Sequence, residues 1–209
     1  ATNSGSSKIW GPNTNDRDCD MIVSGAGSTA TTLDLYLSGS SRTATVTNSP
    51  FRLQITDNGL LRVTRYTAIW TNGLVRLDDG TLFNSTKGVV NRGRLEGRGR
   101  LERHDASGTV VWDNYGTIKP GLTNWVYGAL VFTNCDLTLR PSSELVFDIG
   151  AALPESYSRL VVHGAAALDG ACQVRLASGY EPKHADTFQL IDADSFSGAN
   201  AHEDHIRAR

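Results

Sequence analysis

Hydrophobic and polar residues alternate along much of this chain with a period of two, which is typical of half-buried β-strands. Residues 33–37, 51–55 and 144–149 show the alternation clearly. No segment keeps an apolar period of 3.6 residues, and turn sequences such as Asp57-Asn58-Gly59 separate the apolar runs. The pattern therefore predicts an all-β chain of many short strands.

A second pattern spaces asparagine, glycine and aliphatic residues two apart. An Asn-x-Gly-x-aliphatic unit begins at Asn91 and recurs at Asn114, and Gly97 and Gly99 between them predict a turn. Recurrence of about 20 to 25 residues, built from short strands and glycine turns, is typical of a solenoid. We therefore expect a right-handed parallel β-helix in which inward aliphatic side chains, such as Leu139 and Phe147, stack in columns.

The chain divides into three segments on composition. Residues 1–28 are rich in Gly, Ser, Asn and Asp and predict an irregular lead-in or N-terminal cap. Residues 29–198 predict the β-helix itself, and residues 199–209 predict a polar C-terminal tail. The chain begins at Ala1 without a signal sequence, so we expect a processed chain or a segment of a longer one.

The spaced pattern resembles the passenger β-helix of bacterial autotransporter-type and related β-strand-repeat surface proteins. The resemblance covers roughly residues 58–198, and at Ser158 the chain departs from the family, which usually has an acid there. It implies an extracellular structural or adhesive module, because members of that family are mostly adhesins and stalks. The residues that carry it are Asn91, Gly93, Leu95, Gly97, Gly99, Leu101, Asn114, Gly116, Ile118, Leu130, Phe132, Leu145, Phe147, Tyr180 and Phe188.

Charge, hydropathy and cysteine content argue against nucleic-acid binding, membrane insertion and a disulfide framework. The 209 residues carry a formal net charge of -2, so the molecule has no overall field that attracts nucleic acid or an anionic membrane. No apolar run is long enough to insert into a membrane. The three cysteines are too few for a disulfide framework, and the apolar surroundings of Cys135 and Cys172 favour either buried thiols or a bridge between them.

The densest charge cluster is an arginine-rich run. We take it as the candidate face for a ligand or a partner, for example an acidic glycan, although period-two placement also puts such charges on the solvent side of strands. The five arginines are Arg92, Arg94, Arg98, Arg100 and Arg103.

Catalytic chemistry has weak support in the sequence. A polysaccharide-cleaving enzyme needs paired carboxylates across a groove, and Asp192 and Asp194 are the first candidates because they could share one face of a strand. The other candidates by type are Asp113, Asp136 and Asp148. His202 and His205 lack a third metal ligand, so we predict no metal, cofactor or established catalytic residue.

The sequence therefore predicts a secreted or cell-surface structural module that contacts other protein subunits, or copies of itself, through its ends. The alternative is a carbohydrate-active β-helix, either a hydrolase or lyase or a glycan-binding module. In such a carbohydrate-active protein, exposed tryptophan side chains would stack on sugars, and the candidates are Trp10, Trp70, Trp112 and Trp125.

Overall fold

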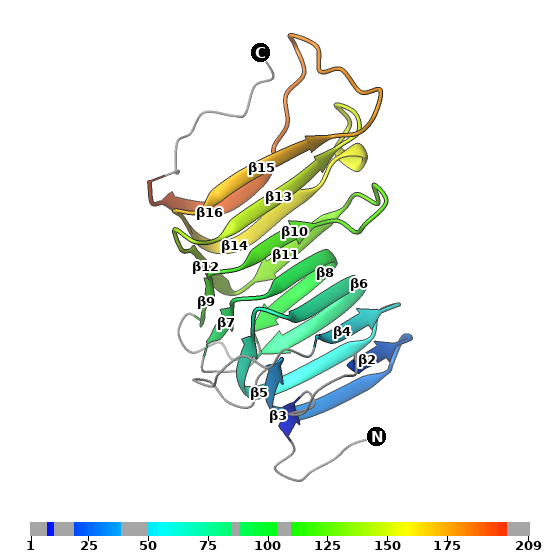
Figure 1. Cartoon of the computed structure of the whole chain (residues 1–209), viewed down its shortest axis with the longest axis vertical. Helices are drawn as coiled ribbons and strands as arrows, with labels where there is room; N and C mark the ends of the chain where they lie inside the picture. The colour runs from blue at the N-terminus through cyan, green and yellow to red at the C-terminus, as the bar shows by residue number, and fades with distance from the viewer. Residues whose placement is uncertain (1–7, 11–18, 39–49, 85–87, 104–109, 200–209) are drawn as a thin grey trace.

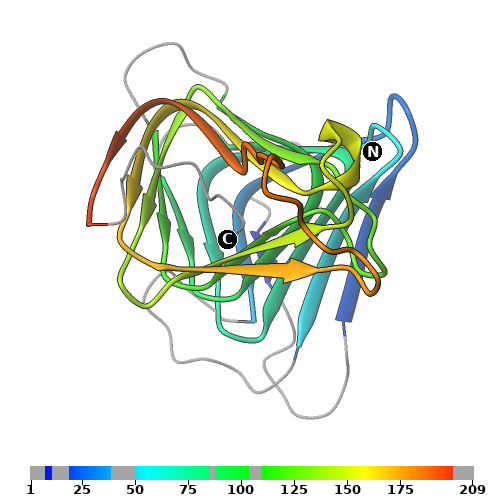
Figure 2. The ribbon, with the colours of Figure 1, turned by 90° about the horizontal axis from the view of Figure 1, so that it is seen from above.

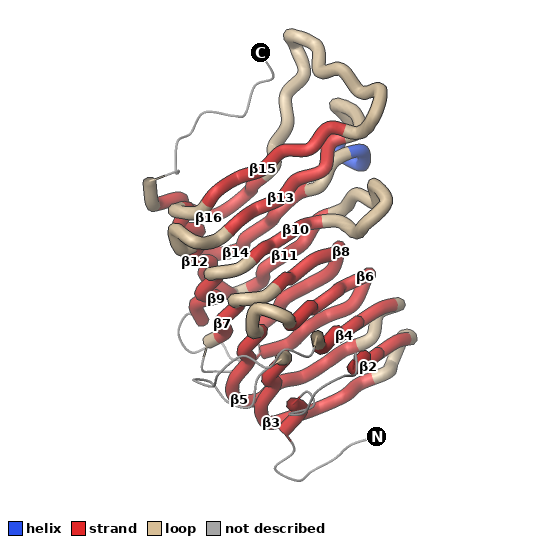
Figure 3. Tube along the Cα trace, viewed as in Figure 1, coloured by secondary structure: helices blue, strands red, loops and turns tan. Residues whose placement is uncertain are grey.

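The computed structural model describes residues 8–10, 19–38, 50–84, 88–103 and 110–199, the side chains of residues 8–10 and 19 excepted. The described chain is all-β, with one short 3-10 helix, η1 (Pro154–Ser156). The predicted strand at residues 43–47 and the histidines His202 and His205 lie outside the described residues. Figure 1 shows the strands one above another along the long axis. Figure 3 shows loops at the sides of the stack and a long loop between β15 and β16 above its C-terminal end.

Sixteen strands make up the described structure. The first eight are β1 (Lys8–Trp10), β2 (Cys19–Ser24), β3 (Thr29–Leu37), β4 (Phe51–Thr56), β5 (Leu60–Ile69), β6 (Gly73–Asn84), β7 (Val89–Asn91) and β8 (Arg94–Arg103). The other eight are β9 (Val110–Asn114), β10 (Thr117–Pro120), β11 (Ala129–Thr133), β12 (Cys135–Leu139), β13 (Glu144–Ile149), β14 (Arg159–Leu168), β15 (Ala171–Leu176) and β16 (Ile191–Ser197).

All pairings between the described strands are parallel, and the pairing closes on itself. The closed ring runs β8–β11–β14–β12–β9–β7–β5–β6 and returns to β8. It closes because the long strands bend and take different partners along their two halves. One half of β14 pairs with β11 and the other half with β12. The remaining strands pair onto this ring from outside, β4 on β6 and β10 on β8 for example.

This closure corrects the predicted fold. The right-handed parallel β-helix expected over residues 29–198 is wrong, and the connectivity is that of a closed eight-stranded parallel β-barrel with peripheral strands. Alternation along the sequence reports which side chains face inward. Alternation cannot predict that a strand of ten or twelve residues bends, so that its two halves pair with two different strands along the same edge. Figure 2 shows the bent strands enclosing the interior.

Aliphatic rows fill that interior. Val75, Leu95, Ile118 and Leu145 stand opposite one another on β6, β8, β10 and β13, and all four are buried. Such in-register stacking removes apolar area from water on every strand at once. Leu139 and Phe147 are buried as well, so the inward phase that the alternation predicted for these two strands is confirmed.

A buried asparagine pair explains the recurring Asn-x-Gly unit. Asn91 and Asn114 are register partners on β7 and β9, and the Asn91 Nδ2 donates to the Asn114 Oδ1 at 2.6 Å. Asn91 also accepts a hydrogen bond from the Gly93 amide at 3.1 Å, and Asn114 donates to the Gly116 carbonyl at 2.9 Å. Each asparagine thus satisfies backbone groups of its own turn while bonding to its neighbour, as buried polar groups require.

The glycines of the unit are needed for close approach. A Cβ at Gly116 would lie 2.2 Å from the Gly93 carbonyl oxygen, and one at Gly93 would lie 2.3 Å from the Gly73 carbonyl oxygen. These contacts are with backbone, so a side chain there would push successive turns apart.

We therefore expect Gly116→Ala to lower the free energy of unfolding by about 3 kcal/mol through overpacking. Gly27→Ala is the matched control, because a Cβ at Gly27 meets no atom within 4 Å. Its cost is limited to the left-handed backbone, about 1 kcal/mol. Urea denaturation of both variants measures the difference, and equal midpoints would contradict the close-packing account.

Candidate functional site

The arginine-rich run does not form one patch of free charge. Three of its members are neutralised by carboxylates on the same or neighbouring strands. Arg94 Nε contacts Glu96 at 2.7 Å, Arg98 bridges Asp78 at 2.7 Å and Asp79 at 3.2 Å, and Arg100 contacts Glu102 at 3.5 Å. The fourth, Arg103, is buried at the end of β8.

The fifth member, Arg92, lies at a corner between aromatic rings. Its guanidinium carbon is 4.3 Å from the Tyr115 ring centroid and 5.7 Å from that of Trp70. Arg140 approaches Tyr115 at 5.8 Å, so aromatic and cationic side chains alternate along this corner. Cation–π contacts of this kind contribute about 0.5–1 kcal/mol each at exposed sites. The role of the run as a ligand face stays a prediction.

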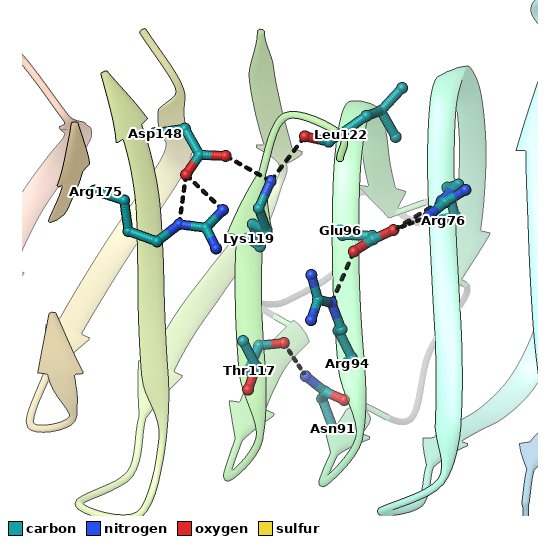
Figure 4. A network of polar contacts seen from close by, with 9 residues as sticks. All are labelled: Arg76, Asn91, Arg94, Glu96, Thr117, Lys119, Leu122, Asp148 and Arg175. Atoms are coloured by element: carbon teal, nitrogen blue, oxygen red, sulfur yellow. Dashed lines mark hydrogen bonds and ion pairs between the residues drawn. The ribbon is translucent and has the colours of Figure 1, made fainter. Parts of the chain in front are cut away.

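A different polar arrangement, which the sequence analysis missed, consists of two buried carboxylates that each contact two cations. It begins at Glu96, whose side chain is buried on β8. Arg76 on β6 contacts its Oε1 at 2.5 Å, and Arg94 contacts its Oε2 at 2.7 Å. Figure 4 shows Glu96 held between the two guanidinium groups. One buried carboxylate thus joins two neighbouring strands.

Asp148 on β13 has the same arrangement with different cations. Lys119 Nζ on β10 lies 2.8 Å from its Oδ2, and Arg175 Nε on β15 donates to its Oδ1 at 2.7 Å. Lys119 also donates to the Leu122 carbonyl at 2.8 Å, which fastens the loop that follows β10. Both Lys119 and Asp148 are buried (Figure 4). Burial, and after it the charge of Asp148, raises the pKa of the Tyr127 phenol.

This geometry favours a structural role over catalysis. Both oxygens of each carboxylate are engaged by cations, so proton transfer to a substrate would first have to break an ion pair. Lys119 is buried and held by Asp148 and by the Leu122 carbonyl, so its amino group does not face solvent or a substrate. Removing one partner of such a buried pair is costly, because the other charge stays out of water.

The carboxylates proposed for polysaccharide cleavage are dispersed. Asp192 and Asp194 are both exposed on β16, on the side of the strand that faces away from Ile191 and Ala193. Asp113 pairs with Arg140 at 2.5 Å, and Asp136 accepts a hydrogen bond from the Ala165 amide at 2.8 Å. Among the described residues, these carboxylates do not face one another as the general acid and the general base of a glycosidase would. A role for Asp192 and Asp194 stays a prediction.

The two described cysteine side chains are free thiols rather than a disulfide. Cys135 is a buried residue of β12 and pairs with Val110, whereas Cys172 is an exposed residue of β15 and pairs with Leu145. Burial raises the pKa of the Cys135 thiol to about 12, and partial desolvation by neighbouring side chains raises that of the Cys172 thiol, part of which still reaches solvent.

No group of three or more His, Cys, Asp or Glu side chains in the part of the chain that the structure describes is arranged to hold a metal ion. No helix among the described residues has the length and apolar character to cross a membrane.

The four tryptophans differ in their exposure to solvent. Trp70 and Trp112 are buried and Trp125 is 42% exposed, whereas the Trp10 side chain is not among those that the structure describes.

No protein-family model and no curated protein matches the sequence. The resemblance to the autotransporter-type passenger is therefore wrong as an identification, since no family match supports it and the strands close into a ring rather than a solenoid. The adhesin assignment, which rested on this resemblance, is wrong for the same reason. The spaced Asn-x-Gly and aliphatic pattern reflects parallel strand packing, which unrelated all-β proteins share.

We expect Asp148→Asn to lower the free energy of unfolding by about 3–5 kcal/mol, because Lys119 would stay buried without its counter-charge. Asp113→Asn is the control, since both side chains of its pair with Arg140 are partly exposed and the change should cost less than Asp148→Asn. The double variant Lys119→Met, Asp148→Leu should regain most of the loss. Chemical denaturation measures all three, and similar values for the two single variants would refute the role of the buried pair.

We also expect Cys135 to resist alkylation in the native protein, because its buried thiol, with a pKa of about 12, stays protonated at pH 8. Cys172 on β15 should be labelled first, because its side chain is exposed. Iodoacetamide labelling followed by peptide mass spectrometry distinguishes the two sites. A Cys135–Cys172 disulfide, or equal labelling, would contradict the structure.

Proposed function

We propose that the protein is a structural module that associates with a second copy of itself through the two ends of its stack of strands. What supports the proposal is the C-terminal end. Among the described strands, β15 pairs with β13 alone and β16 with β14 alone, so each has one unpaired edge. Unpaired parallel edges offer backbone donors and acceptors to a further strand.

Apolar side chains at this end support the same reading. Leu176 stands opposite the buried Ile149 and Phe196 stands opposite the buried Ala166, so both continue inward rows of the core. With no further described strand above them, Leu176 is 44% exposed and Phe196 is 46% exposed. Interior-type side chains that meet solvent at a strand edge are typical of association surfaces.

The other end of the stack provides a fitting counterpart. β2 pairs with β4 alone among the described strands, and its inward residues Met21 and Val23 align with the core residues Leu53 and Ile55. Because β2 and β15 lie at opposite ends of a parallel arrangement, one copy can follow another without reversing strand direction (Figure 1). Such head-to-tail contact uses two different surfaces of the same chain.

The mechanism is stiffness rather than chemistry. Stacked aliphatic rows, the Asn91–Asn114 pair and the buried carboxylates Glu96 and Asp148 hold the strands at fixed spacing. A stiff module of this kind would hold its two ends at a fixed distance and would present its loops to other molecules. The secreted or cell-surface location expected from the sequence stays a prediction.

We expect the molar mass of the wild-type protein, measured by size-exclusion chromatography with light scattering, to rise with concentration. The double variant Leu176→Lys, Phe196→Lys should stay monomeric, because charge at the apolar end opposes strand addition. Leu153→Lys is the matched control, since Leu153 is equally apolar and 55% exposed but lies in the loop before η1.

Circular dichroism and the unfolding midpoint establish that each variant is folded before its mass is compared. A wild-type chain that remains monomeric up to its solubility limit would refute self-association. A double variant that associates as the wild type does would place the contact elsewhere on the molecule.

A further inference from the structure

The loop between β10 and β11, residues 121–128, has an unusual backbone. Asn124 and Trp125 have positive φ angles of 62° and 60°, and Gly121 has a φ of 80°. A bulky residue such as tryptophan rarely adopts the left-handed region, because its Cβ crowds the backbone there. Such conformations cost about 1–3 kcal/mol and persist where the surroundings enforce them.

The surroundings of this loop do enforce its shape. The Gly121 amide donates to the Gly97 carbonyl at 2.7 Å, and the Leu122 amide donates to the Val126 carbonyl at 2.8 Å, which closes the loop on itself. Lys119, buried and paired with Asp148, donates to the Leu122 carbonyl at 2.8 Å. The buried charges shown in Figure 4 therefore support a preformed loop.

The held loop presents an aromatic side chain to solvent. Trp125 is 42% exposed, and Thr123 and Asn124 beside it are exposed polar residues. Arg175 lies 6.0 Å from the indole ring. Its Nε and one Nη contact Asp148, so its other Nη is not engaged by that carboxylate. Since Lys119 and Arg175 share one Asp148, this place carries one surplus positive charge.

We propose that Trp125 and Arg175 form a binding site for an oligosaccharide that contains uronic acid. A pyranose ring would stack on the exposed indole, and its carboxylate would accept a hydrogen bond from the free Nη of Arg175. The apolar area is one indole and the adjacent Val126, flanked by polar side chains. That suits one or two sugar rings and falls far short of the roughly 800 Å² per partner of a stable protein interface.

Trp125 lies in the loop between β10 and β11, whereas Arg175 lies on β15 directly before Leu176, so the site borders the end through which we propose self-association. The two proposals use different side chains of β15, because Leu176 continues an inward row and Arg175 points to the outer side, where it contacts Asp148. The support for the binding site is the combination of an exposed indole, an enforced left-handed backbone and a cation with an unused donor. The sequence contained one part of this signal, since Trp125 was among the candidate sugar-stacking residues, but its neighbour Arg175 comes from a strand fifty residues further along.

The test is isothermal titration calorimetry of the full chain with α-1,4-linked hexagalacturonate, and with the carboxyl-reduced hexamer of the same linkage. We expect saturable binding of the acidic hexamer and at least about tenfold weaker binding of the reduced one, a difference of about 1.4 kcal/mol. Trp125→Ala should abolish binding, whereas Trp125→Phe should retain part of it. Arg175→Lys, which keeps a charge beside Asp148, should reduce the preference for the acid.

Val111→Ala is the control, because Val111 is an exposed apolar residue on β9, away from the loop. The indole N–H resonance that disappears in Trp125→Ala should shift on titration of the wild type. An unchanged unfolding midpoint for Trp125→Ala excludes loss of fold as the reason for lost binding. Absence of binding to both hexamers, or equal binding by wild type and Trp125→Ala, would overturn the proposal.

Discussion

In-register parallel pairing is the constraint on which the rest of this structure depends. Each strand bonds in parallel register to strands from other parts of the chain, so a residue often lies opposite a residue of the same kind. Asparagine therefore meets asparagine at Asn91 and Asn114, and glycine meets glycine at Gly93 and Gly116. A side chain that suits one turn must suit both neighbours, which restricts the corner positions more strongly than the outward ones.

Buried charge supplements this backbone constraint on the outer side of the sheet. Glu96 ties β6 to β8, and Asp148 ties β10 and β13 to β15. Each carboxylate meets two cations, so its desolvation is offset by two attractive contacts and no acceptor oxygen is left bare. The cations that also reach solvent, such as Arg175, then become available for contacts beyond the fold.

The sequence predicted local features well, because period-two alternation and turn chemistry act within a few residues. It placed Leu139 and Phe147 inward, and it placed a turn at Asp57-Asn58, where both residues have positive φ. It failed where partners come from different turns. Gly97 and Gly99 lie within β8, where they permit its bend, rather than in a turn between strands. That bend gives β8 two successive partners and contributes to ring closure.

The buried ion pairs could not be predicted from the sequence, because their partners lie far apart along the chain. Asp148 looked like any outward carboxylate, and its partner Lys119 is identifiable only once β10 and β13 are known to be neighbours. The arginine run looked like a charged patch because its members are close in sequence. The bend in β8 and the nearby carboxylates separate and neutralise most of them.

The loop between β10 and β11 has a consequence for how such a protein can change. Both flanking strands take their register from β8, β10 through Thr117–Pro120 and β11 through Leu130–Thr133. The loop that joins them therefore does not set their alignment. Residues can be gained or lost there without moving a single strand pairing, so evolution, or a designer, can replace this surface segment while the scaffold keeps its form.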